Sequence, residues 1–419
     1  MSTLPSDGSS RPFVFLHVGD QHLTVRDAPH HRDLVAILDQ IASFGRDAYD
    51  FVYLPGDIAE NGAAGEYALI EEALRSQPSL PVLLIPGDHD RQYGSMEDFA
   101  RFHDAVMAGR HPSVANDLLQ PPAGPGVDPQ RASIPQYYYA ADYGAVRCLF
   151  VDMISAGFGQ KGKGLDFRIG PTQMDWLSAE VVRARREGKT CAVFMHAYPD
   201  DLEKKEAAEV AGLFWSQGVR LVEMGHTHYN ELAHDGRTTY AAARSVGQNE
   251  DGSVGYAVGA IDAGEVSWRF RPLDRVGPFV LITSPADRRL ATHGLRGDEA
   301  GRIAVRAVVL SDEAPSLCRC RVDDGPWQGM ERIADGPAYT ASVAWTYGAR
   351  RLTVEAIDPR WPGYGPDYID RDVIEPASSV FVGPMRPDRP GSDACSLGAW
   401  LDKGVRGDQL GPNRAGRDW

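Results

Sequence analysis

Cysteine is scarce in this sequence, with five among 419 residues. Cys148 and Cys191 fall in strand-like runs and are expected to be buried thiols. Cys318 and Cys320 alternate along one strand, and no second pair follows at the spacing of a zinc site. This usage predicts a reduced, cytoplasmic protein without a cysteine-based zinc site.

Long apolar runs and positive charge are also in short supply. Residues 1–12 are polar and lack the apolar core of a signal peptide, and no run approaches the length that spans a membrane. The 43 Lys and Arg residues are outnumbered by 58 Asp and Glu, which gives a formal net charge of -15 and a pI near 5.3. The densest basic patch, residues 183–186, lies on a helical pattern and is expected to be a solvated face. Because binding to nucleic acid needs clustered Lys and Arg, neither a nucleic-acid partner nor a membrane contact is predicted.

What the sequence does contain is a set of short apolar runs that end in Asp or His. With 43% hydrophobic residues, a chain of this length can bury a large core and is expected to form two domains. The runs, which predict buried strands, cover residues 13–18, 51–55, 81–86, 191–195 and 219–224. The polar residues that follow them are Asp20, His22, Asp57, Asp88, His89, Asp90, His196, His226 and His228. Because ligands bind at the carboxyl ends of strands in an open α/β sheet, we expect these side chains to meet.

Segments with helical spacing of apolar residues alternate with these strands. They cover residues 32–44, 66–75, 95–107, 171–187 and 202–214. Successive strands follow at 238–243, 254–261 and 265–270. The alternation predicts an α/β fold with helices on both faces of a mainly central sheet. Residues 112–135, rich in Pro and Gly, are expected to form an irregular insertion near the site, and residues 154–169 a mobile loop.

A second domain is predicted from residue 276 onward. Short strand-like runs separated by turn residues replace the alternating pattern, and they cover residues 279–284, 302–310, 317–322, 339–345 and 351–357. This pattern is typical of a small immunoglobulin-like all-β sandwich. The predicted organisation is a tail over 1–12, a first domain over 13–275, the β-sandwich over 276–383, and a tail over 384–419 that is disordered or wraps the body. The sandwich is also the predicted surface for a homo-oligomer.

Four imidazoles and three carboxylates at the predicted strand ends indicate a metal site. Imidazole and carboxylate without thiolate suit Mn, Fe, Zn or Ni. Seven ligands exceed what one cation accepts, but they serve two cations when one carboxylate bridges. Such a pair can bind a phosphoryl oxygen and lower the pKa of a bridging water.

These residues resemble the motifs of the calcineurin-like metallophosphoesterases. The matching motifs, in the order of the family, are Asp20-x-His22, Gly56-Asp57, Gly87-Asp88-His89-Asp90, His196 and Gly225-His226-Thr227-His228. Within the family the sequence is most similar to the bacterial class III cyclic-nucleotide phosphodiesterases. The stretch 56–62 ends in Gly62 as it does there, and Pro86 precedes the third motif. The resemblance implies a four-layer αββα metallophosphoesterase sandwich in which the later strands form the second sheet.

The resemblance also implies a role for each residue. The ligands of the first metal would be Asp20, His22 and His228. Those of the second would be Asp88, His196 and His226, with Asp57 bridging the two. The implied cofactors are two divalent or trivalent transition-metal ions (Mn, Fe or Zn), and the reaction is attack of a metal-bridging hydroxide on phosphorus. His89 would donate a proton to the leaving oxygen, and Asp90 would either orient His89 or cap the turn.

One position departs from the family, in which the second metal takes Asn where this chain has Asp88. Asp adds a negative charge and removes an amide donor that would face the substrate. It is expected to hold the second cation more tightly and to repel a phosphate dianion. The difference therefore favours a diester or another less charged substrate.

Several polar residues near the predicted ligands are candidates for contacts with substrate. They are Asn61, Arg91, Tyr93, Tyr198 and Asn230, each with an ordinary structural role as the alternative. Arg168 is a further candidate, as an anchor for an anion. His17 lies on a strand face and is expected to be a core histidine with a satisfied hydrogen bond.

The sequence thus predicts a dinuclear metal-dependent hydrolase that cleaves a small phosphodiester. One alternative is a phosphomonoesterase, nucleotidase, phosphoprotein phosphatase or phosphonate-type esterase on the same site. Another is a metal-binding scaffold without turnover. An intact His89 argues against the scaffold, which needs no proton donor beside its metals.

Overall fold

The computed structural model describes residues 11–91, 95–110, 136–157, 165–249, 252–295, 297–334, 336–346, 348–361, 375, 377–383 and 410. Tyr93 and the predicted insertion at 112–135 lie outside this part of the chain. So do seven residues of the predicted mobile loop, 158–164, and both predicted tails apart from residues 11, 12 and 410.

The first domain contains two sheets that mix parallel and antiparallel strands. The first has the order β11-β10-β1-β2-β3, with β1 (Phe13–His17), β2 (Phe51–Leu54), β3 (Val82–Leu84), β10 (Gly255–Asp262) and β11 (Glu265–Pro272). The second has the order β4-β5-β6-β7-β9-β8, with β4 (Tyr139–Tyr143), β5 (Val146–Phe150), β6 (Thr190–Phe194), β7 (Leu221–Met224), β8 (Glu231–His234) and β9 (Thr239–Ala242). Strands β1, β2 and β3 run parallel, as do β5, β6, β7 and β9. These two parallel sets carry the predicted ligands at their carboxyl ends.

Aromatic side chains pack the two sheets against each other. The ring of Phe194 in β6 meets Phe15 of β1 and Phe51 of β2 edge-on, with centroids 5.2 Å and 5.4 Å apart. The Tyr53 hydroxyl donates to the Met195 carbonyl oxygen at 3.1 Å. Because a hydrogen bond is directional while apolar packing is not, this contact fixes the end of β2 against the end of β6.

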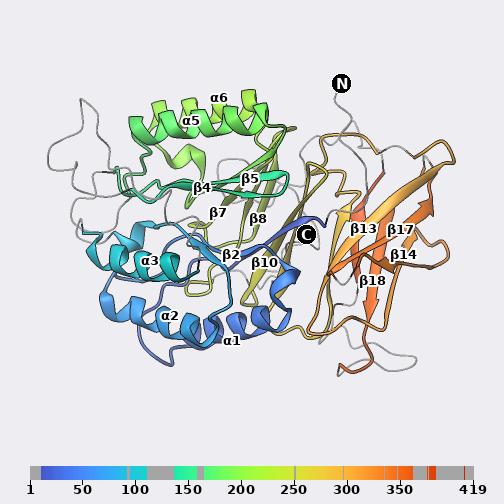
Figure 1. The fold of residues 1–419 in the computed structure, drawn as a ribbon, viewed down its shortest axis with the longest axis horizontal. Coiled ribbons are helices and arrows are strands. Elements are labelled where there is room, and N and C mark those ends of the chain that lie inside the picture. Colours follow the sequence, from blue (N-terminus) through green and yellow to red (C-terminus); the bar gives the residue numbers. More distant parts are fainter. Residues whose placement is uncertain are drawn as a thin grey trace.

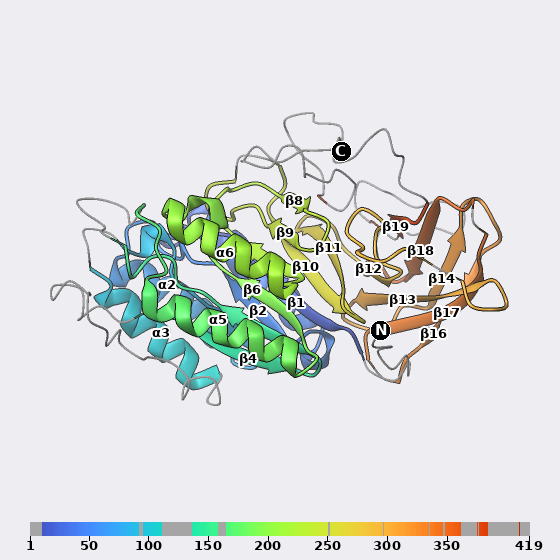
Figure 2. The same ribbon diagram turned by 90° about the horizontal axis from the view of Figure 1, so that it is seen from above.

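Helices cover the outer faces of the two sheets. Figure 1 and Figure 2 show α1 (Pro29–Ser43), α2 (Ala64–Ser76) and α3 (Glu97–Arg110) on the side of the first sheet, and α5 (Pro171–Arg186) and α6 (Lys204–Gln217) on that of the second. Short 3-10 turns lie at η1 (Arg46–Ala48), η2 (Asp88–Asp90) and η3 (Pro199–Asp201). Leu34, Ile37 and Ile41 of α1 are fully buried, as their spacing predicted. The order helix, sheet, sheet, helix confirms the αββα sandwich.

Two expectations about the sheets are wrong. The helices cover two stacked sheets rather than both faces of one central sheet. Strand β9 joins the second sheet as expected, but β10 and β11 extend the first. Strand β10 pairs antiparallel with β1, from Phe13 opposite Ile261 to His17 opposite Ala257. This pairing satisfies the edge of β1, whose backbone groups would otherwise be exposed.

The C-terminal strands form two antiparallel sheets around a separate apolar core. Their orders are β12-β13-β17-β16 and β15-β14-β18-β19. The strands are β12 (Phe279–Ser284), β13 (Arg302–Leu310), β14 (Leu317–Val322), β15 (Gln328–Gly329), β16 (Glu331–Arg332), β17 (Ala338–Ala344), β18 (Arg351–Ile357) and β19 (Ala377–Phe381). Val280, Val305 and Val354 are buried in this core. The arrangement confirms the β-sandwich, and the domain limits stay a prediction.

The sandwich also packs on the first domain. Phe279 and Leu281 of β12 belong to the same apolar cluster as Trp268 and Phe270 of β11. Leu410 is fully buried in this cluster as well. Among the described residues, the four cysteines Cys148, Cys191, Cys318 and Cys320 are free and buried, which confirms the prediction of buried thiols at Cys148 and Cys191. None of the helices in the described ranges has the length and apolarity needed to cross a membrane.

Candidate metal centre

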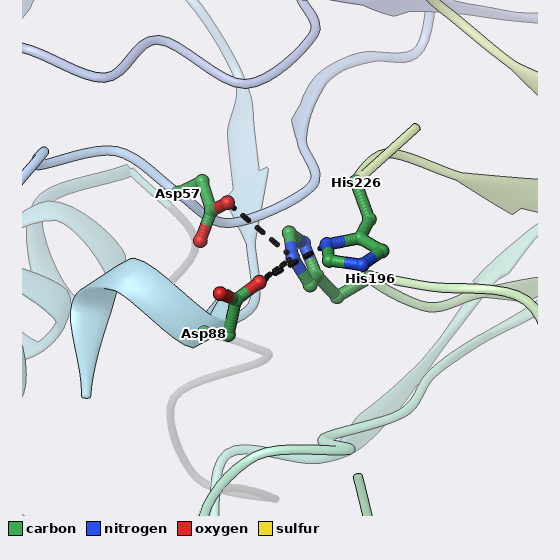
Figure 3. Close-up of side chains that lie close together, drawn as sticks. All are labelled: Asp57, Asp88, His196 and His226. Carbon is green, nitrogen blue, oxygen red and sulfur yellow. Dashed lines mark hydrogen bonds and ion pairs between the residues drawn. The ribbon is translucent and has the colours of Figure 1, made fainter. Parts of the chain in front are cut away.

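The predicted ligands meet where the carboxyl ends of the two parallel strand sets adjoin. They are Asp20 and His22 after β1, Asp57 after β2, Asp88 in η2 after β3, His196 after β6, and His226 and His228 after β7. Two groups have ligand atoms within 4.8 Å of one another, so each could hold a cation. One is Asp57, Asp88, His196 and His226 (Figure 3), and the other is His22, Asp57 and His228. Asp57 belongs to both, as expected of a bridging ligand.

Four of these residues have a left-handed backbone. The φ angle is 45° at His22, 50° at Asp57, 66° at His226 and 62° at His228. A residue other than glycine in this region costs on the order of 1–3 kcal/mol, and such residues cluster at functional sites. The strain therefore supports a site at these strand ends independently of the residue types.

Two glycines allow the ligand-bearing turns to approach one another. A Cβ on Gly87 would lie 2.3 Å from Asp57 Oδ1 and 2.7 Å from His196 Cε1. A Cβ on Gly225 would lie 2.5 Å from Asp20 Oδ1. Each contact is shorter than a van der Waals contact allows, so both positions require glycine.

Hydrogen bonds hold the group that contains Asp88. Its Oδ1 atom lies 3.1 Å from His196 Nε2 and 3.0 Å from His226 Nδ1 (Figure 3). His196 Nδ1 donates to the Pro55 carbonyl oxygen at 2.8 Å. Because a carbonyl only accepts, Nδ1 carries a proton and Nε2 is the nitrogen available to a cation.

Asp57 faces both groups through a single oxygen. Its Oδ2 atom lies 3.6 Å from His196 Nε2 and 3.7 Å from His22 Nε2. His22 Nε2 in turn lies 3.0 Å from His228 Nε2. This arrangement would allow one carboxylate to contact two cations.

Buried carboxylate oxygens without hydrogen bonds fit bound cations. Among the described residues, Oδ1 of Asp20 and Oδ2 of Asp57 are buried and lack a hydrogen-bond partner. Leaving such oxygens unsatisfied is costly, and a cation would satisfy them. Asp20 is in neither group, although its Oδ1 lies 3.9 Å from His196 Nδ1 and its Oδ2 accepts from the His226 amide at 3.0 Å. The nitrogen and oxygen donors suit the transition metals that the sequence predicted.

The pKa values of the site reflect concentrated negative charge. Burial raises the pKa of Asp57 to about 7, and repulsion from Asp88 adds to this effect. Burial acts to lower the pKa of His196, but attraction from Asp57 and a hydrogen bond to Asp88 raise it to about 10. At Asp88, hydrogen bonds with His196 and His226 outweigh burial and hold the pKa of the carboxyl well below its usual range. In the metal-free protein, protons held by these side chains thus balance part of the negative charge, and a bound cation would replace them.

Asp90 caps the turn after β3. Its carboxylate accepts from the Gly87 amide at 2.9 Å and from the Tyr67 hydroxyl at 2.8 Å. The amides of Ile58 and Ala59 approach it at 3.4 Å and 3.3 Å. These contacts match the turn-capping alternative rather than the orientation of His89.

Glu60 takes the orienting role instead, and the motifs do not reveal it. Its carbonyl oxygen accepts from His89 Nδ1 at 2.8 Å, and its Oε2 lies 2.9 Å from His22 Nδ1. These three residues form a third group close enough for a cation. Because both Nδ1 atoms face oxygens of Glu60, we interpret this group as a hydrogen-bonded cluster. The available signal was an acid three positions after Asp57.

Gln248 is a second site residue without a sequence signal. Its Nε2 donates to Glu60 Oε2 at 2.7 Å across 188 positions of sequence. It lies in the segment after β9, where no motif marks it. Only the folded chain brings the two side chains together.

Two of the predicted substrate-binding residues form hydrogen bonds with other groups of the protein. Asn61 donates from its backbone N–H and its Nδ2 to Glu66, at 2.8 Å and 2.9 Å. Arg91 is buried, and its Nη1 donates to the carbonyl oxygens of Ile154 at 2.7 Å and Gly157 at 2.5 Å. These contacts favour the structural alternative for both.

The other described candidates are likewise bonded within the protein. The Tyr198 hydroxyl donates to Glu231 Oε2 at 2.6 Å, and Arg168 Nε donates to Asp166 Oδ1 at 3.0 Å. Asn230 Nδ2 donates to the Leu410 carbonyl oxygen at 2.7 Å. Tyr93 lies outside the described residues. His17 Nδ1 lies 2.6 Å from Glu223 Oε1 in the interior, which confirms the expected core histidine.

Comparisons with known proteins point to one family. Residues 13–230 match the profile described as calcineurin-like phosphoesterase. A search of curated proteins found no match. The fold is similar to a dimetal phosphatase from Danio rerio, at 15% identity and a TM-score of 0.46, over 63% of this chain and 97% of that chain. It is also similar to a putative 5′-nucleotidase from Staphylococcus aureus, at 13% identity and a TM-score of 0.40, over 64% of this chain and 55% of that chain. Likenesses this distant carry no argument about function, whereas the profile covers more than half of the 419 residues. The chain therefore belongs to the calcineurin-like phosphoesterase family.

Proposed function

We propose that the protein hydrolyses a small, soluble phosphodiester with the help of two transition-metal ions. The observation that carries the proposal is the buried Oδ2 of Asp57, which faces ligand nitrogens of both groups at 3.6 Å and 3.7 Å. When bound, a pair of cations stabilises charge on a phosphoryl oxygen and lowers the pKa of a water between them. Manganese, iron and zinc all suit the donor set.

The residues of the chain would hold these ions and move one proton. His22, His228 and Asp57 would hold the first ion beside Asp20, and Asp57, Asp88, His196 and His226 the second. The bond from His89 Nδ1 to the Glu60 carbonyl fixes that ring and leaves Nε2 to exchange a proton with the leaving oxygen. Burial, followed by repulsion from His22, lowers the pKa of His89. His89 therefore reaches the protonated form that donates the proton at a lower pH than an ordinary histidine does.

The negative charge of Asp88 favours a diester substrate over a monoester. Its hydrogen bonds to His196 and His226 keep the carboxyl ionised. A phosphate monoester brings a dianion beside this charge, whereas a diester brings a single negative charge. The similarity to the class III cyclic-nucleotide phosphodiesterases forms part of the same proposal.

The test compares matched aryl esters with the full-length protein at saturating Mn(II). We expect a higher kcat/KM for bis(4-nitrophenyl) phosphate than for 4-nitrophenyl phosphate. Both activities should disappear in Asp57→Ala and persist in His293→Ala, which changes an exposed histidine paired with Glu265. A faster monoester would overturn the diester proposal in favour of a phosphomonoesterase. If neither ester is hydrolysed by protein that binds two metal ions, the alternative of a scaffold without turnover stands.

A further inference from the structure

Glu60 contacts two histidines of the centre through different atoms. Its side-chain Oε2 lies 2.9 Å from His22 Nδ1, while its backbone carbonyl accepts from His89 Nδ1 at 2.8 Å. The other ring nitrogen of His22 belongs to the first group, where it lies 3.0 Å from His228 Nε2. The Glu60 carboxylate is therefore within hydrogen-bond distance of the metal ligand and lies 3.5 Å from His89 Nδ1, whereas the backbone carbonyl accepts the hydrogen bond from the proton donor.

The Glu60 carboxylate is itself held in place. Gln248 Nε2 donates to Oε2 at 2.7 Å. The Gln248 amide donates to Ser245 Oγ at 2.8 Å, and that hydroxyl donates to the Asp20 carbonyl oxygen at 2.7 Å. The Glu60 amide also donates to the Leu23 carbonyl oxygen at 3.0 Å. These bonds connect the turns after β1 and β2 with the segment after β9.

A carboxylate facing Nδ1 decides which nitrogen of a neutral imidazole carries the proton. The carboxylate accepts only, so Nδ1 carries the proton and the lone pair lies on Nε2. Acceptors of this kind fix the orientation of metal-binding histidines and raise their basicity. We propose that Glu60 is a positioning residue that presents Nε2 of His22 to the first cation, and that Gln248 holds Glu60 there. The inference rests on the proposed dinuclear centre.

Metal binding tests this inference without reference to turnover. Full-length protein is titrated with Mn(II), and bound and free ion are followed by electron paramagnetic resonance. Glu60→Ala should weaken the first site by about 10–100-fold and leave the second site unchanged. Glu60→Gln keeps an acceptor oxygen and should restore part of the affinity for Mn(II). Gln248→Ala should weaken the affinity of the first site less than Glu60→Ala does. Unchanged affinity in Glu60→Ala would overturn the inference.

A matched control separates positioning from disruption of the loop. Glu66 accepts from the backbone N–H groups of Asn61 at 2.8 Å and Ala63 at 3.3 Å, so it stabilises the segment that follows Glu60. Glu66→Gln should bind Mn(II) like the wild type. An equal loss in Glu66→Gln would show that loop structure, and not Glu60, sets the affinity.

The split between side chain and backbone supplies a kinetic readout. At saturating Mn(II), Glu60→Ala should keep the wild-type dependence of kcat on leaving-group pKa, because it removes the carboxylate 3.5 Å from His89 Nδ1 but keeps the carbonyl that accepts from this atom at 2.8 Å. In His89→Ala the dependence of kcat on leaving-group pKa should become steeper, because poor leaving groups are slowed most. A steeper dependence in Glu60→Ala would overturn the assignment of separate roles. Wild-type protein that binds fewer than two Mn(II) ions would overturn both the inference and the proposed function, whereas unchanged affinity in Glu60→Ala alone leaves the proposed function intact.

Discussion

The Nε2 atoms of His22 and His228 lie 3.0 Å apart, although 206 positions separate the two residues in the chain. Since His22 Nδ1 faces the carboxylate of Glu60, its Nε2 atom carries the lone pair. Two ring nitrogens at this distance need a proton or a cation between them. The two imidazoles thus form a site that can bind a cation at one end of the centre.

Removing either imidazole should empty this end of the centre. We expect His228→Ala to lower the bound metal from two ions per chain to one, measured by elemental analysis after loading with Mn(II) and gel filtration. His293→Ala, which changes a histidine whose side chain is 87% exposed, should keep both ions. Full occupancy in His228→Ala would mean that this imidazole is not a ligand.

Metal uptake should release protons and strengthen as pH rises. In the metal-free protein the pKa of His196 is raised to about 10, so this imidazole is protonated at pH 8 and must lose its proton to bind a cation. Lower pH adds protons, including one on Asp57, whose pKa is raised to about 7. Affinity should therefore fall as pH decreases from 8 to 6. Calorimetry in two buffers of different ionisation enthalpy measures the proton release, and equal heats in both buffers would contradict it.

Much of the centre could be predicted because its information is local. Each predicted ligand stands within five residues after the end of a short apolar strand, and the glycines at 87 and 225 stand immediately before Asp88 and His226. Parallel strands bring their carboxyl ends to one edge, so local signals along the chain translate into a shared site. The αββα layers were predicted by the resemblance to the family, because the alternation alone indicated one central sheet.

The rest depends on contacts that leave no local signal. The pairing of β10 with β1 joins segments from opposite ends of the first domain. The role of Glu60 for His89 uses a backbone carbonyl, which every residue possesses. Asn230 stands beside the ligand motif, yet its amide bonds to Leu410, which no pattern in the tail indicated. The position of residues after strands therefore predicted which Asp and His side chains meet, whereas nearness to these residues did not predict the contacts of Asn61, Arg91 and Asn230.

Leu410 should contribute to the stability of the whole chain. Its side chain is fully buried, and its carbonyl oxygen accepts from Asn230 Nδ2 at 2.7 Å and Arg244 Nη2 at 3.1 Å. Leu410→Ala should lower the free energy of unfolding by about 2–5 kcal/mol, as for other buried leucines. Leu165→Ala, at a residue that is 61% exposed, is the control and should have little effect on thermal unfolding. Equal stability of the two variants would show that Leu410 is not an anchor.

Apolar residues at the interface between the domains should contribute to stability as residues of a hydrophobic core do. Leu281 of β12 is 3% exposed and shares the apolar cluster of Trp268. Leu281→Ala should lower the unfolding free energy by about 2–5 kcal/mol while the metal content stays at two ions per chain. Chemical denaturation and elemental analysis together check this. Loss of metal without loss of stability would show that the sandwich acts on the centre rather than on the fold.

Asp88 should set the preference between phosphate esters. Asp88→Asn removes a negative charge but can keep an oxygen at the position of Oδ1, which lies 3.1 Å from His196 Nε2 and 3.0 Å from His226 Nδ1. We expect the ratio of kcat/KM for aryl monoesters over diesters to rise. At an effective dielectric constant of about 20, two unit charges ~4 Å apart interact by roughly 4 kcal/mol. Bound cations compensate much of this, and a quarter of it still changes relative rates about fivefold.

The competing effect is weaker binding of the second cation, because the neutral amide oxygen is a poorer ligand than the carboxylate. Loss of metal would slow both esters together, whereas loss of repulsion favours the dianion alone. The ratio of the two rates therefore isolates the charge, provided that both proteins are measured at saturating Mn(II) with metal content confirmed. Asp20→Asn removes the same charge beside the first ion rather than the second and serves as the comparison. If Asp88→Asn leaves the ratio unchanged at full occupancy, Asp88 acts only as a ligand, and other parts of the pocket select the substrate.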